Sequence, residues 1–375
     1  MKHVIGAVLL ALASLGSAHA ADWAWEDDPI SDPFLVNPAG FPSAVGSATE
    51  IEAAMEGALR TWNVEGDASV FLAYDGQTSD TAFGGTDDGQ NLVHAQATGT
   101  GTDLVTTQVT VEALNTDDII DCDIRFHTTN GDGAVDWSAD PLGATTGVYD
   151  LERALLREMG RCLGLEEADS DTSVMRPVLP DGTGPEGRHL AAEDTTALQA
   201  LYGEAEVVFE HYTHAVLYDI DDENGDHRGA PGEEVLVQAT VRNLADTAIG
   251  LTGSIGVTSS TATLEVPVDV QDLGDLLNGE VGQLYNVLTI VDCFPNANTV
   301  TFEVNLEDAR GDTYQVSFDT WIQCADPSMP NNEEEEPDGC GCASGPAIGW
   351  WPVVALLALL PRRRTPRSAG RIRAG

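Results

Sequence analysis

The feature of this sequence that most constrains its fold is a change of pattern at about residue 204. Before it, stretches with helical periodicity alternate with short β-rich runs, and after it apolar residues come only in short runs separated by turn residues. A period near 3.6 predicts amphipathic helices, whereas alternation predicts strands. A chain of 375 residues is long enough for two hydrophobic cores. We therefore predict an α+β part followed by an all-β part.

Three helices are predicted in the first part. Ser47 and Glu50 form a capping-box pattern ahead of an amphipathic stretch that reaches Trp62. A second helix is predicted at about 150–165, and a third at 191–202, stopping at Gly203. Four β-rich runs lie between the first and second helices, at 70–74, 91–96, 104–111 and 119–126.

The second part contains six short apolar runs with turn signals between them. They lie at 235–241, 253–257, 262–268, 285–291, 299–305 and 314–321. Six or seven strands at such spacing are typical of an immunoglobulin-like β-sandwich.

The first twenty residues have the pattern of a secretory signal peptide. Lys2 precedes an apolar stretch, and small residues at Ala18 and Ala20 predict cleavage before Ala21. A buried N-terminal helix is the alternative. We expect an exported protein divided into segments 1–20 (signal peptide), 21–44 (N-terminal extension), 45–203 (first domain), 204–326 (sandwich), 327–339 (acidic linker) and 340–375 (tail).

The C-terminal tail combines Cys340 and Cys342 with an apolar run at 347–360 and a cluster of arginines. The apolar run is short for a membrane span, which needs about 20 residues. This combination resembles the myxobacterial C-terminal sorting tag. The resemblance implies that the helix is removed and that the protein is anchored to the cell surface or outer membrane near Cys340. An ordinary C-terminal membrane anchor is the alternative, with nearly the same localisation.

The charge balance excludes some partners. The net charge is −45, and all 62 acidic residues lie in residues 21–338 together with only ten arginines. Such a surface repels nucleic acids and anionic lipids and attracts cations. The sequence names no partner, and we expect an extracellular protein or polysaccharide.

Four cysteines lie between the two ends of the chain, an even number that predicts disulfides in an exported protein. Cys293 and Cys324 both fall in the second part and are expected to pair there. Cys122 and Cys162 would then pair in the first part and tie a strand to a helix.

The predicted second helix carries the pattern R-E-x-x-R-x-x-G-x-x-E. Arg157 and Arg161 are four residues apart, Glu158 follows the first arginine, and Gly164 and Glu167 complete the spacing. Zinc proteases of the metzincin type have histidines at the positions of Arg157, Arg161 and Glu167, with a glutamate as general base and a methionine turn below the metal. Taken alone, R-E-x-x-R could equally be a solvated helix face.

Flanking segments extend this similarity over roughly residues 45–203. They are 120–126, 149–151, 190–203 and a candidate methionine turn at Met175. Together they resemble the matrixin family of secreted peptidases. The resemblance implies a metzincin-like fold, with a twisted, mainly parallel sheet and two to three helices, and a vestigial general base at Glu158.

Two of the three ligand positions cannot bind zinc, because arginine stays protonated and offers no lone pair. We therefore predict a pseudopeptidase without zinc, in which Arg157 and Arg161 form ion pairs with Glu158 and Glu167. The alternative is an active zinc-dependent metalloendopeptidase with a non-standard ligand set of Glu158, Glu167 and Asp169.

A second acidic motif lies at the junction between the two parts. Asp219, Asp221, Asn224 and Asp226 surround a glycine turn and resemble a Ca²⁺ loop, although the full twelve-residue pattern is missing. A plain acidic turn is the alternative, and no other cofactor is expected.

Overall fold

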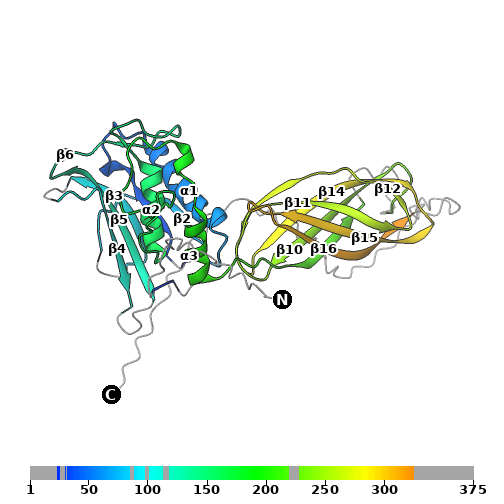
Figure 1. Cartoon of the computed structure of the whole chain (residues 1–375). Helices are drawn as coiled ribbons and strands as arrows, with labels where there is room; N and C mark the ends of the chain where they lie inside the picture. The colour runs from blue at the N-terminus through cyan, green and yellow to red at the C-terminus, as the bar shows by residue number, and fades with distance from the viewer. Residues whose placement is uncertain are drawn as a thin grey trace, which may run out of the picture. The chain divides into compact units, whose positions relative to one another are not determined.

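The computed structural model describes residues 23–25, 30, 32–84, 88–97, 101–112, 118–218 and 228–324 (Figure 1). Buried apolar side chains form two hydrophobic cores, one within residues 25–198 and the other within 235–324. The fold class is α+β, and among the described residues helices occur only in the first part. The boundaries proposed for the two domains stay a prediction, because all the described residues belong to one compact unit.

The first core is built on a mainly parallel sheet with the strand order β2-β1-β3-β5-β4. Parallel pairing joins β1 to β2, β1 to β3 and β3 to β5, whereas β4 runs antiparallel to β5 at the edge. The short strand β6 pairs with β5, and β7 pairs with β8. The strands are β1 Phe34–Asn37, β2 Tyr74–Gln77, β3 Asn91–Ala97, β4 Val105–Val111, β5 Ile119–Asn130, β6 Gly133–Ala134, β7 Trp137–Ser138 and β8 Tyr149–Asp150.

Three α-helices accompany this sheet: α1 Ala48–Glu65, α2 Leu151–Cys162 and α3 Ala192–Tyr202. The predicted capping box starts α1, where the Glu50 amide donates to Ser47 Oγ at 3.3 Å and the Ser47 amide donates to Glu50 Oε2 at 2.7 Å. The Trp62 indole N–H donates to the Leu156 carbonyl at 2.7 Å and ties α1 to α2. Two 3₁₀ turns lie at Pro38–Gly40 and Pro185–Gly187.

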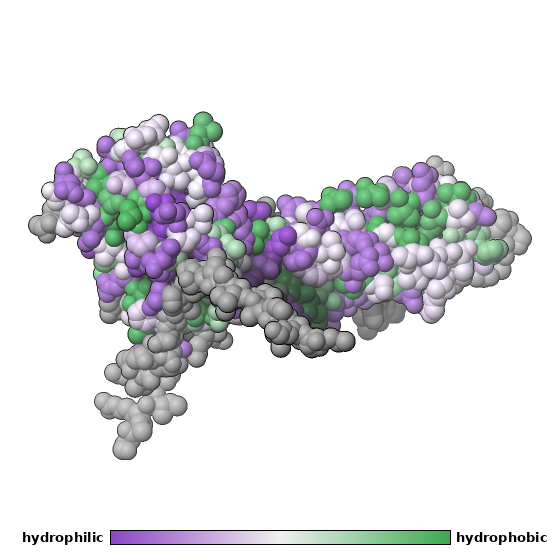
Figure 2. All heavy atoms as spheres, viewed as in Figure 1, coloured by the Kyte–Doolittle hydropathy of each residue, from purple (hydrophilic) through white to green (hydrophobic). Residues whose placement is uncertain are grey.

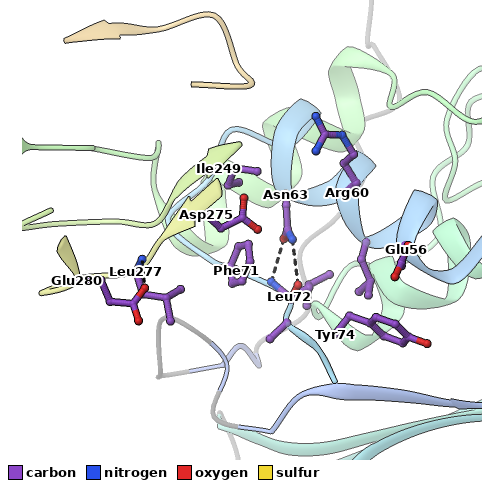
Figure 3. A pocket seen from close by; sticks show the side chains of 12 residues that line it. Glu56, Arg60, Asn63, Phe71, Leu72, Tyr74, Ile249, Asp275, Leu277 and Glu280 are labelled. Atoms are coloured by element: carbon purple, nitrogen blue, oxygen red, sulfur yellow. Dashed lines mark hydrogen bonds between the residues drawn. The ribbon is translucent and has the colours of Figure 1, made fainter. Parts of the chain in front are cut away.

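One prediction for the first sheet was wrong, and one strand was not predicted. The structure places β1 inside the sheet, between β2 and β3, in a segment that carried no strand prediction. The run predicted at 70–74 is a strand only from Tyr74 on. Before Tyr74, the backbone of this run is hydrogen-bonded to a side chain and not to another strand. The Asn63 side chain donates to the Leu72 carbonyl and accepts from the Leu72 amide, both at 2.9 Å (Figure 3).

The second core lies between two four-stranded antiparallel sheets, ordered β12-β14-β10-β9 and β13-β11-β15-β16. This is a β-sandwich, and all six predicted runs overlap its strands. Sequence reasoning missed β9 and β13. The strands are β9 Phe209–Leu217, β10 Glu234–Asn243, β11 Ala248–Ser260, β12 Thr263–Glu265, β13 Gln271–Leu276, β14 Val281–Asp292, β15 Asn296–Glu307 and β16 Thr313–Cys324.

Much of the visible surface is hydrophilic, with apolar areas among it (Figure 2). Exposed large apolar side chains include Val268, Val270 and Trp321 on the sandwich. Within the described ranges, no helix is both long and apolar enough to cross a membrane.

Each core contains one disulfide. Cys122 on β5 joins Cys162 at the end of α2, with Cα atoms 5.6 Å apart, and both cysteines are fully buried. Cys293 joins Cys324 at the end of β16, with Cα atoms 6.3 Å apart. Two disulfides fit an oxidising environment and so an exported protein.

We expect the double substitution Cys122→Ala/Cys162→Ala to lower the free energy of unfolding by about 2–4 kcal/mol, because the bridge closes a long loop in the unfolded chain. Urea titration at pH 7 measures this. An unchanged urea midpoint would show that the bridge adds nothing to stability.

Candidate functional site

The candidate site is the basic face of α2, formed by Arg153, Arg157 and Arg161. Their spacing of four residues places them along one side of the helix. Asp150 starts the helix by accepting a hydrogen bond from the Arg153 amide at 2.9 Å. The helix ends at Cys162, and Gly164 follows with a φ of +80° that favours glycine.

Four charged side chains meet on this face. Arg157 forms ion pairs with Glu158 and, at 2.9 Å, with Glu167. Arg161 pairs with Glu158 at 3.3 Å and also with Glu167. The structure therefore contains the ion pairs expected from the sequence, with two cations balancing two anions.

The Glu158 carboxylate is the buried member of this ion-pair cluster, with a side chain 5% exposed, against 44% for Glu167. Its Oε1 accepts from Arg157, and its Oε2 accepts from Thr107 of β4 at 2.7 Å and contacts Arg161. A carboxylate with both oxygens bound by donors on several sides is stabilised as an anion. Three of its roughly four acceptor sites already receive donors, so little acceptor capacity is left for water.

The same basic face also holds the segment 173–177. Arg153 donates to the carbonyls of Ser173 at 3.0 Å and Val174 at 2.9 Å, and burial lowers the pKa of Arg153 to about 10. Arg157 donates to the carbonyls of Arg176 at 2.9 Å and Pro177 at 3.1 Å. The arginines therefore anchor a loop as well as the two glutamates.

Met175 lies inside this loop and is fully buried. It packs directly against α2 at Gly160, where an added Cβ would come within 2.3 Å of the Met175 sulfur and 2.8 Å of the Trp62 ring. Glycine at position 160 therefore sets how closely the loop approaches the helix.

Sequence reasoning missed three residues of the site. Arg153 continues the four-residue spacing, a signal that was present in the sequence. Thr107 and Asp194 gave no such signal, because they come from β4 and α3. Asp194 is fully buried and accepts from the Val174 amide at 2.9 Å and from the Ser173 hydroxyl, so it ties the loop to α3.

The alternative zinc ligands are not brought together. In the part of the chain that the structure describes, no three His, Cys, Asp or Glu side chains could hold a metal ion, so Glu158, Glu167 and Asp169 form no such group. The candidate calcium residues Asp219, Asp221, Asn224 and Asp226, and also Cys340 and Cys342, lie outside the described residues.

Comparisons with known proteins do not identify a family for this chain. No protein-family model and no curated protein matches this chain. Solved structures similar to it include a conjugative transposon lipoprotein from Bacteroides eggerthii (17% identity, 30% of this chain and 94% of that chain, TM-score 0.19). Others are a FixG-related protein from Vibrio parahaemolyticus (16%, 30% and 94%, TM-score 0.18) and a sporulation control protein from Bacillus subtilis (17%, 30% and 49%, TM-score 0.18).

The assignment to the matrixin family is wrong. No family model matches, and the described residues contain no group of three or more candidate metal ligands. The metzincin-like fold has no support from a family match. The roles expected for Glu158 as a vestigial base and for Met175 in a methionine turn stay predictions. R-E-x-x-R instead supplies a helix face that binds carboxylates and loop carbonyls. The assignment of the C-terminus to the sorting-tag family falls for the same lack of a match.

We expect Glu158→Gln to destabilise the protein by about 3 kcal/mol, because it removes the buried partner of two arginines. Glu167→Gln also removes a carboxylate that pairs with arginines, but at an exposed position. It should lower the free energy of unfolding by less than about 1 kcal/mol. Urea unfolding of both variants at pH 7 tests this. If both variants lost the same free energy of unfolding, burial would not be what decides the strength of these ion pairs.

A second buried polar feature lies on the first sheet. His94 of β3 is 2% exposed, and neither of its ring nitrogens has a hydrogen-bond partner among the described residues. It is paired in register with Arg125 of β5. Burial and then the charge of Arg125 lower the pKa of His94, and the same two causes lower the pKa of His127. Both imidazoles are therefore held neutral.

This predicts a loss of stability in mild acid. Because the pKa of His94 is lower in the folded chain than in the unfolded chain, the unfolded state binds more protons below about pH 6.5. The free energy of unfolding should be at its full value above that pH and fall as the pH drops below about 6.5. We expect His94→Leu to reduce this fall, while His189→Gln, at a side chain 68% exposed, leaves it unchanged. Urea midpoints at several pH values measure the effect, and identical slopes in His94→Leu and wild type would contradict it.

Proposed function

We propose that this chain is an exported protein of the cell surface that has no protease activity and acts in binding or as a structural element. The observation that carries the proposal is the state of Glu158. Its oxygens are occupied by Arg157, Arg161 and Thr107, so the acidic group of the candidate site is used for packing.

The chemistry of the surrounding residues supports this proposal. Guanidinium groups only donate hydrogen bonds, and on α2 they donate to carboxylates and to main-chain carbonyls of residues 173–177. The closely spaced charges fasten a loop to a helix and a strand, and both cores carry a disulfide. Such an arrangement restrains the loop and the two cores and therefore suits a rigid protein.

The proposed partner is an extracellular protein or polysaccharide. With a net charge of −45, the chain repels nucleic acids and anionic surfaces. The signal-peptide pattern and the two disulfides support export, and the apolar and arginine-rich tail supports attachment to a membrane. The sandwich part, which we take to be immunoglobulin-like, would present the binding surface.

The activity test uses the purified chain with casein and with gelatin, each with added Zn²⁺ and with a chelator. We expect no cleavage above the blank in either condition, and no difference between wild type and Glu158→Gln. Cleavage that disappears both with the chelator and in Glu158→Gln would overturn the proposal in favour of an active metalloendopeptidase.

The location can be tested separately. If the chain is displayed at the surface, protease added to intact cells should remove it while a cytoplasmic marker stays intact. Retention of the protein in protease-treated cells would contradict surface display without bearing on the activity test.

A further inference from the structure

Two histidines of β9 lie side by side at one edge of the sandwich. His211 and His214 are three residues apart, a spacing that would normally place them on opposite faces of a strand. The register of β9 with β10 shifts between Thr240 and Val241, because Thr240 pairs with Thr213 and Val241 with His211. This bulge adds Tyr212 to β9 and brings both histidines to the same face.

The two imidazoles are held by one aromatic ring. Both stack on Phe318 of β16, in the facing sheet, with ring centroids 4.6 Å from His211 and 4.5 Å from His214 and interplanar angles of 16° and 21°. Phe318 stacks in turn on Phe302 of β15. The ring orientations are therefore set by the sandwich core.

The facing nitrogens are at the separation expected for two ligands of one metal ion. His211 Nε2 and His214 Nδ1 are 3.1 Å apart. With metal–nitrogen distances of about 2.05 Å, this separation corresponds to an N–metal–N angle of about 98°, which lies between the square-planar and the tetrahedral values.

The hydrogen bonding of the pair also suits a metal. The His211 ring forms a hydrogen bond with the Thr213 backbone. Because His211 Nε2 faces His214, this bond uses Nδ1, as the outer nitrogen of a metal-bound histidine usually does.

We propose that His211 and His214 form a binding site for one divalent transition metal ion, with Cu²⁺ bound most tightly and water in the remaining positions. The ion binds His211 Nε2 and His214 Nδ1 in place of the hydrogen bond between them. The proton on His214 Nδ1 moves to Nε2 of the same ring, so no net proton is released. Imidazole pairs suit Cu²⁺, Ni²⁺ and Zn²⁺, and Cu²⁺ leads this affinity order.

The test measures Cu²⁺ binding to the purified full chain after alkylation of free thiols, by calorimetry at pH 7. We expect one tight ion per chain, and a loss of affinity of at least about tenfold in His211→Phe and in His214→Phe, because even loss of an outer-shell partner costs about 10- to 100-fold. Phenylalanine keeps an aromatic ring on Phe318, and urea midpoints identify any variant that is misfolded.

The control variant is His189→Gln, which removes an exposed histidine paired with Glu65. It should bind Cu²⁺ like the wild type. Electron paramagnetic resonance of the wild-type complex should show two nitrogen ligands, a readout that does not depend on how the variants fold. Equal binding by wild type and both phenylalanine variants, or a spectrum with oxygen ligands only, would show that the many carboxylates bind the ion and would overturn the proposal.

Discussion

A buried carboxylate on a helix is the constraint on which the candidate site depends. Glu158 is 4% exposed and cannot remain charged there without partners. Arg157 and Arg161 supply opposite charge from the same helix, and Thr107 supplies a hydroxyl from β4. The carboxylate therefore links the edge of the sheet to α2 and fixes which side of the helix faces inward.

From this contact, a chain of donors extends to the following loop. Arg153 and Arg157 bond four carbonyls of residues 173–177, and Asp194 of α3 bonds the Val174 amide of the same loop. Met175 can then pack against Gly160, where only a hydrogen leaves enough room. These charged groups thus tie the loop to both α2 and α3.

In the sandwich too, the sequence pattern and the tertiary geometry determine different features. Alternating apolar residues build its core, whereas a single bulge decides that His211 and His214 share a face. The stacking of both rings on Phe318 joins one sheet to the other and places two nitrogens 3.1 Å apart. Local irregularity in a regular fold is what brings these two groups together.

The sequence by itself determined the fold class, the three helices and most strands, because periodicity and caps act locally, as Ser47 and Glu50 show. It also determined the residues that could pair on α2, since helical spacing is fixed. Only the tertiary structure decided that β1 lies inside the sheet and that Leu72 bonds Asn63. It also decided that Thr107 and Asp194 complete the site. These outcomes depend on contacts between segments far apart in the chain, which local pattern does not encode.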